Sequence, residues 1–138
     1  MACTKTGHEG GCFCGAVRYR VDGPVGSVTH CHCNSCRRSS GAAFVTWFTV
    51  ERERVAWSGA KAAQYPSSPG VVRGFCGTCG TELTYANEQA AKTIDITIGS
   101  LDCAAGHPAE KHIWTSDKLG WLHVDEQLPV YEGWPTES

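Results

Sequence analysis

Seven of the nine cysteines in this chain are grouped at spacings typical of metal ligands. The three groups hold two, three and two thiols: Cys12 and Cys14, then Cys31, Cys33 and Cys36, then Cys76 and Cys79. Four thiolates complete a closed tetrahedral zinc site that stabilises a fold, whereas three leave a position for water or substrate. The grouping therefore predicts two zinc ions, one structural and one able to take part in chemistry.

The first and last pairs are expected to form the structural site. Cys76 and Cys79 belong to a Cys-x-x-Cys-Gly loop, whose backbone N–H groups can turn toward the sulfurs. Cys12 and Cys14 lie two positions apart, so an extended backbone points both side chains the same way. Structural zinc contributes about 10–16 kcal/mol, which is comparable to the whole stability of a small domain. Ordinary buried cysteines without metal are the alternative interpretation.

The central triplet is expected to hold zinc with one open position. Cys31 and Cys33 converge as in the first pair, and Cys36 returns after a two-residue Asn-Ser turn. A soft site of three thiolates favours a further sulfur ligand, so an incoming thiol would bind as thiolate. Arg37 and Arg38 follow directly, and they could offset the negative charge or bind an anionic part of a substrate.

Other residues could close the open position of the triplet. His30 or His32 could be the fourth ligand, although strand alternation places both on the face opposite the cysteines. Asp102, Cys103 or His112 could arrive from elsewhere in the fold. His112 could instead contact substrate or assist proton transfer near the thiolates. A redox-sensing set of thiols without metal is a further alternative.

Length and composition limit the class of protein. The 138 residues fit a single domain, 1–138, with a core over about 8–134. A formal net charge of −2 shows no basic excess, which argues against nucleic-acid binding. No apolar run approaches the roughly 20 residues that span a bilayer, and residues 1–11 lack the apolar stretch of a secretory signal. A reducing cytosol is therefore expected, where thiols remain available for metal.

The elements that must position these cysteines are expected to be short strands, because glycine is abundant and apolar residues alternate. Strands are predicted over 16–21, 43–50, 71–75, 82–86 and 93–98. Only 34–40 and 87–92 offer a helical turn, and the 61–74 region, rich in Pro and Ser, is expected to be a surface loop. Residues 1–9, which include Cys3 as a bystander, and 135–138 are expected to be frayed ends. The predicted fold class is all-β with few or no helices.

Four parts of the chain resemble one known family, the glutathione-dependent formaldehyde-activating enzymes, which include domains of the centromere protein V type. The similar segments are 10–19 (GGCFCGAVRY), 30–44 (HCHCNSCRRSSGAAF), 75–83 (FCGTCGTEL), and 99–102 (GSLD) with 112–114 (HIW). Together these segments extend over nearly the whole chain. The cysteine triplet with the two arginines after it is the most specific of them.

The resemblance implies a zinc-stapled β-tent, similar to the fold of a small zinc-bearing chaperone of Rab GTPases. It assigns the two outer cysteine pairs to a structural zinc, and Cys31, Cys33 and Cys36 to a catalytic zinc. It also implies a carbon–sulfur lyase or synthase, in which the glutathione thiol adds to formaldehyde and gives S-hydroxymethylglutathione. Arg37 or Arg38 could then neutralise a glutathione carboxylate. A zinc-stabilised module that binds glutathione or a protein without turnover is the alternative function.

Overall fold

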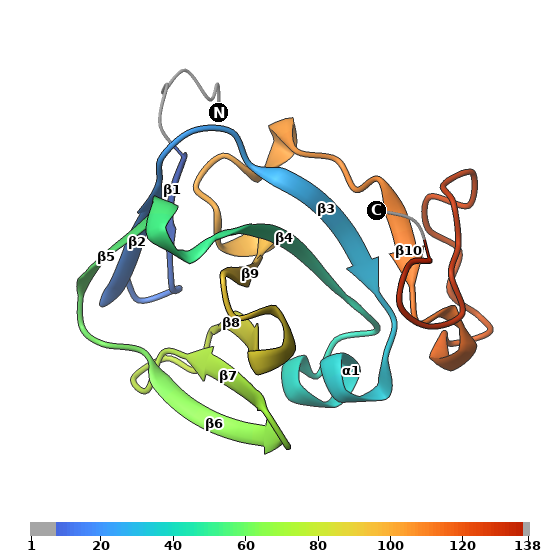
Figure 1. Ribbon diagram of the computed structural model, residues 1–138, viewed down its shortest axis with the longest axis horizontal. Helices are drawn as coiled ribbons and strands as arrows, with labels where there is room; N and C mark the ends of the chain where they lie inside the picture. Colours follow the sequence, from blue (N-terminus) through green and yellow to red (C-terminus); the bar gives the residue numbers. More distant parts are fainter. Residues whose placement is uncertain (1–7, 137–138) are drawn as a thin grey trace.

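Two β-sheets make up most of the computed structural model, which describes residues 8–136 (Figure 1). The smaller sheet contains, in spatial order, β1 (His8–Gly11), β2 (Val17–Val21) and β5 (Val55–Gly59). The larger sheet contains, in spatial order, β10 (Lys111–Ile113), β3 (Gly26–Cys31), β4 (Val45–Glu51), β9 (Thr93–Thr97), β8 (Glu82–Asn87), β7 (Val71–Phe75) and β6 (Ala63–Ser68). Neighbouring strands are antiparallel except β10 and β3, which are parallel.

The main core lies where the smaller sheet packs against one face of the larger sheet. Tyr19 and Val21 of β2 join a buried cluster with Phe48 of β4 and Ile96 of β9. Because side chains alternate across a strand, Trp47 and Thr49 of β4 are directed to the other face. That other face of the larger sheet carries the pocket described below, so β4 contributes to both the core and the site.

The predicted all-β class is confirmed, and the strands predicted from alternation are observed as β2, β4, β7, β8 and β9. The segment 34–40 forms α1 (Asn34–Ser40), which is the one α-helix within residues 8–136. Residues 87–92 contain a single 3₁₀ turn, Glu88–Ala90. No helix in the described range has the length and apolar character needed to cross a membrane.

Two expectations about irregular segments were wrong. The 61–74 region is not a loop, because β6 pairs with β7 along its length. Pro66 fits there since β6 is an edge strand, whose outer side needs no N–H donor. The predicted frayed start also fails at His8 and Glu9, which pair with β2 as part of β1. Residues 1–7 and 137–138 of the two predicted ends lie outside the described residues, and Cys3 is among them.

Candidate functional site

The outer cysteine pairs meet in one group with the dimensions of a tetrahedral metal site. The sulfurs of Cys12, Cys14, Cys76 and Cys79 all lie within 4.8 Å of one another. The Cys12–Cys14 and Cys14–Cys76 separations are 3.6 and 3.8 Å. A tetrahedron with Zn–S bonds of about 2.3 Å has sulfur–sulfur edges of about 3.8 Å, so the group could hold a metal ion and is compatible with zinc. The Val17 amide donates to Cys12 Sγ at 3.2 Å, as expected for a stabilised thiolate.

The central triplet forms a second group, which is built by the junction of β3 and α1. Cys31 ends β3, and Cys33 is the N-cap of α1, where its sulfur accepts a hydrogen bond from the Cys36 amide at 3.2 Å. The Cys31 and Cys36 sulfurs lie 3.5 Å apart, and all three sulfurs lie within 4.8 Å of one another. Gly41 ends the helix in the left-handed region (φ 71°), a conformation that glycine adopts without a Cβ clash.

The three thiols of the triplet oppose one another's ionisation. Hydrogen bonds with Cys31 and Cys36 lower the pKa of Cys33, whereas hydrogen bonds with Cys33 and Cys36 raise the pKa of Cys31. One thiolate is therefore stabilised at the cost of its neighbours. All three can be thiolates together only when a cation compensates their charge, as a bound metal ion does.

The histidines that could have closed the triplet lie on the opposite face of the sheet. His30 shares a hydrogen bond of 2.7 Å with the Asp125 carboxylate, and His32 shares one of 2.8 Å with His112. The other ring nitrogen of His112 contacts the Asp125 carbonyl at 2.9 Å. Burial, with the neighbouring His112 as a smaller cause, lowers the pKa of His32 to about 4. Among the described residues, no histidine nitrogen or carboxylate oxygen joins the three sulfurs.

The two other candidates for the fourth position also lie apart from the triplet. Asp102 forms an ion pair at 2.6 Å with Arg18 of β2, the central strand of the smaller sheet. Cys103 is half-buried immediately after it and does not belong to the three-sulfur group. Within residues 8–136, the triplet therefore keeps the three-cysteine composition expected from its spacing.

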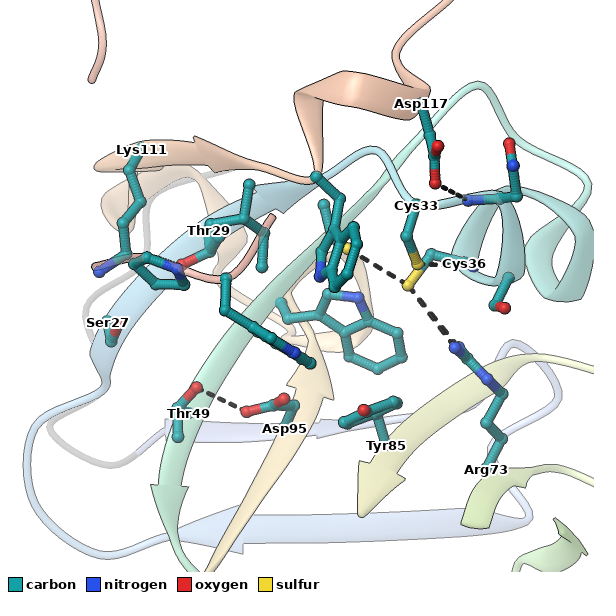
Figure 2. A pocket seen from close by; sticks show the side chains of 18 of the residues that line it. Ser27, Thr29, Cys33, Cys36, Thr49, Arg73, Tyr85, Asp95, Lys111 and Asp117 are labelled. Carbon is teal, nitrogen blue, oxygen red and sulfur yellow. Dashed lines mark hydrogen bonds between the residues drawn. The ribbon is translucent and has the colours of Figure 1, made fainter. Parts of the chain in front are cut away.

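A pocket of about 490 Å³ opens directly onto the triplet (Figure 2). Such a volume falls within the roughly 300–1,000 Å³ range of small-molecule sites. Its floor is the face of the larger sheet that points away from the core, and the segment after β10 forms one wall. The lining includes Ser27, Thr29, Cys31, Cys33, Cys36, Trp47, Thr49, Arg73, Tyr85, Asp95, Lys111, Ile113, Trp114, Asp117 and Trp134.

Arg73 of β7 brings a buried positive charge to the triplet. Its side chain is 7 % exposed, and its guanidinium donates to Cys36 Sγ at 3.7 and 3.8 Å. The same group pairs with Glu82 at 3.2 Å, contacts the Ser39 hydroxyl and lies over the Tyr85 ring, 5.1 Å from its centre. Three thiolates with a bound divalent cation would have a net charge of −1. The positive charge of Arg73 would balance it, and the Glu82 carboxylate would then add one further negative charge.

Of the residues predicted to contact substrate, the structure brings none into this pocket. Arg37 and Arg38 line a separate hollow with Leu119 and Trp121. His112 is 2 % exposed and belongs to the histidine cluster on the other face. Arg73 was missed by the sequence analysis. An arginine in a strand of otherwise apolar or small residues was the available signal, but nothing in its spacing linked it to the cysteines.

Replacing Arg73 by methionine is expected to destabilise the protein by about 3–5 kcal/mol, because the change leaves Glu82 as an unpaired charge that is 12 % exposed. Chemical denaturation followed by tryptophan fluorescence measures the change. The double variant Arg73→Met with Glu82→Gln should recover more than half of the loss, since it removes both charges.

The matched control for Arg73 is Arg20→Met, which removes an exposed arginine whose partner, Asp22, is also exposed. The free energy of unfolding of Arg20→Met should stay within about 0.5 kcal/mol of that of the parent protein. Equal stabilities for Arg73→Met and Arg20→Met would show that the buried pair with Glu82 is not needed for stability.

Comparison with known proteins identifies a matching family, two related proteins and one solved structure with a similar fold. Residues 7–117 match a family model described as glutathione-dependent formaldehyde-activating enzyme. A Halomonas elongata protein provisionally given that name is 27% identical over 142 residues, which cover 94% of this chain and 90% of that protein. An uncharacterised lyase of Schizosaccharomyces pombe is 29% identical over 79 residues, 57% of each chain. A crystal structure of a Rhodobacter sphaeroides protein has a similar fold, with a TM-score of 0.58, 16% identity, and coverage of 89% of this chain and 98% of that one.

Proposed function

Since this chain belongs to the glutathione-dependent formaldehyde-activating enzyme family, we propose that it is a zinc-dependent carbon–sulfur lyase or synthase. Its reaction is the addition of the glutathione thiol to formaldehyde, giving S-hydroxymethylglutathione, and the reverse cleavage. The observation that carries this proposal is the three-sulfur group at one end of a pocket large enough for a small molecule.

The donor sets of both cysteine groups suit zinc, because thiolates are soft ligands and the sulfur–sulfur distances match a tetrahedral site. We assign the four-cysteine group to structure and the triplet to chemistry. Zinc held by Cys31, Cys33 and Cys36 would supply Lewis acidity, which lowers the pKa of a thiol and polarises a carbonyl oxygen. The Arg73 guanidinium stabilises the thiolate form of the triplet through its contact with Cys36.

The atoms of the reaction balance without any further reagent. A carbon–sulfur bond forms as the thiolate sulfur attacks the formaldehyde carbon. The proton that leaves the thiol is matched by one that the former carbonyl oxygen takes up. The pocket contributes by holding the thiol close to the triplet, with Trp47, Ile113 and Trp114 restricting water on the apolar side. Arg37, Arg38 and His112 receive no substrate role here, because they lie outside this pocket.

We also propose that the protein works in a reducing cytosol. Metal binding requires the seven cysteines of the two groups to be reduced, since a sulfur in a disulfide cannot become a thiolate ligand. A reducing compartment keeps cysteines in this form.

The zinc-loaded protein is expected to accelerate the interconversion of glutathione, formaldehyde and S-hydroxymethylglutathione in proportion to its concentration. Exchange NMR at equilibrium measures this rate directly above the uncatalysed background. Saturation with glutathione should coincide with its binding curve from calorimetry. Saturable binding without any acceleration would show that the protein is a glutathione-binding module and not an enzyme for this reaction. Absence of binding at millimolar glutathione would show that glutathione is not the ligand.

A further inference from the structure

Two charged side chains line the pocket away from the triplet. Lys111 comes from β10 and Asp95 from β9, and Figure 2 shows both well separated from Cys36 and Arg73. Both residues are half-buried, and within residues 8–136 neither has an ion-pair partner. Asp95 accepts one hydrogen bond, from the Thr49 hydroxyl at 2.5 Å. Partly buried charges without partners cost free energy unless a ligand supplies the opposite charge.

The strand register keeps these two charges on the same face but apart. Lys111 is directly opposite Thr29 on β3, and Asp95 is directly opposite Thr49 on β4. β10 and β9 are separated by three steps of the sheet, and each step is about 4.8 Å, so their main chains are about 14 Å apart. This spacing explains why Lys111 and Asp95 do not neutralise each other. A ligand that satisfies both must carry opposite charges at separated points.

The same register connects Asp95 with the triplet. Tyr85 is opposite Asp95, and Arg73 is opposite Tyr85, on consecutive strands of the sheet. Arg73 in turn contacts the Cys36 sulfur. A ligand with its sulfur at the triplet would therefore extend past Arg73 and Tyr85 before it reached the Asp95 carboxylate.

We propose that this pocket selects thiols of the amino-acid type, with Asp95 binding a ligand ammonium and Lys111 binding a ligand carboxylate remote from the sulfur. The inference rests on the proposed function, because it takes the sulfur end of the pocket to be the triplet. Glutathione meets the requirement, since its γ-glutamyl end carries an ammonium and each end carries a carboxylate. A thiol without an ammonium leaves Asp95 unpaired and is discriminated against for that reason.

The environment of Asp95 supports its proposed role in binding an ammonium group. Burial raises the pKa of Asp95, whereas the hydrogen bond from Thr49 acts in the opposite direction. A bound ammonium would favour the charged carboxylate and form a charge-assisted hydrogen bond with it. Recognition of the ammonium is thus expected to be sensitive to the loss of a single charge.

The test measures binding of S-methylglutathione, whose capped sulfur cannot react, and of its glutaryl analogue, which lacks only the ammonium. Calorimetry is carried out on the zinc-loaded parent protein, Asp95→Asn and Lys111→Met. Asp95→Asn should weaken S-methylglutathione by at least about tenfold and leave the glutaryl analogue nearly unchanged. Lys111→Met should weaken both ligands. Lys61→Met, at an exposed site outside the pocket, is the matched control and should weaken neither.

The possible failures of this experiment are distinct from those of the proposed function. Equal weakening of both ligands by Asp95→Asn, or no weakening at all, overturns the role of Asp95. Lack of any effect of Lys111→Met overturns the role of the lysine, and lack of saturable binding to the parent protein overturns the whole inference. Because the probes do not react, Asp95-dependent binding would still support the inference in a protein that shows no turnover of formaldehyde.

Discussion

Replacement of Cys76 by serine is expected to prevent folding. Cys76 is 1 % exposed and packs with Cys12, Val17 and Leu83 in a small cluster around the four-sulfur group. A metal ion there would join the segment after β1 to the turn between β7 and β8, two parts of the chain more than 60 residues apart. Structural zinc supplies about 10–16 kcal/mol, whereas small domains are stable by about 5–15 kcal/mol, so losing one ligand removes most of the net stability.

The measurement for Cys76→Ser is the yield of soluble protein, with thermal unfolding and zinc content of whatever remains soluble. Thr78→Ala is the matched control, because Thr78 is exposed in the same turn and its side chain forms no hydrogen bond in the described structure. This control should fold and bind zinc like the parent protein. A soluble Cys76→Ser protein with an unchanged unfolding temperature would sink the structural assignment of the four-cysteine group.

Replacement of Cys33 by serine is expected to abolish the chemistry while the fold remains. Cys33 is the N-cap of α1, and serine is itself a preferred N-cap, so its hydroxyl can accept the hydrogen bond from the Cys36 amide. The metal site loses one of three ligands. Mutation of a residue that only hydrogen-bonds to a metal-ligating side chain typically lowers metal affinity or activity by about 10–100-fold. Loss of a metal-ligating side chain itself should therefore lower turnover by at least about 100-fold.

Zinc content, thermal unfolding and turnover together test the Cys33 prediction. We expect loss of about one of two zinc equivalents, an unfolding temperature close to that of the parent, and no acceleration of the glutathione–formaldehyde reaction above background. Comparison with Cys76→Ser is informative, because the two variants should fail in different ways. Near-normal turnover by a Cys33→Ser protein that has lost the zinc of the triplet would show that the reaction does not need that site.

The local parts of the site were predictable because short-range geometry decides them. Two cysteines separated by one residue on a strand face the same way, and the Cys-Asn-Ser-Cys turn brings Cys36 back toward Cys33. The helical turn at 34–40 and the histidines on the opposite face follow from the same rules. The strands with clear alternation, such as Thr93–Thr97, were also recognised.

The positions of the arginines could not be predicted from local spacing. Arg37 and Arg38 follow Cys36 directly, which made them natural partners for the triplet. Each residue of an α-helix turns the side-chain direction by about 100°, so residues next to a metal ligand on a helix point elsewhere. Arg73 occupies the position near Cys36 although 36 residues separate it from that cysteine. β6 was not predicted for a related reason. A proline argues against a strand in the sequence unless the strand is known to lie at the edge of a sheet.

The sequence by itself determined the two groups of candidate metal ligands, the sheet-rich class and the family resemblance, because each depends on residue types at short and regular spacings. Tertiary structure alone decided what surrounds the triplet. Arg73, Tyr85, Asp95 and Lys111 come from four different strands, and only the order and register of those strands place them on one face. Strand pairing over such separations is set by the packing of the whole sheet, so the cysteine groups could be predicted, whereas the charged and aromatic residues around the triplet could not.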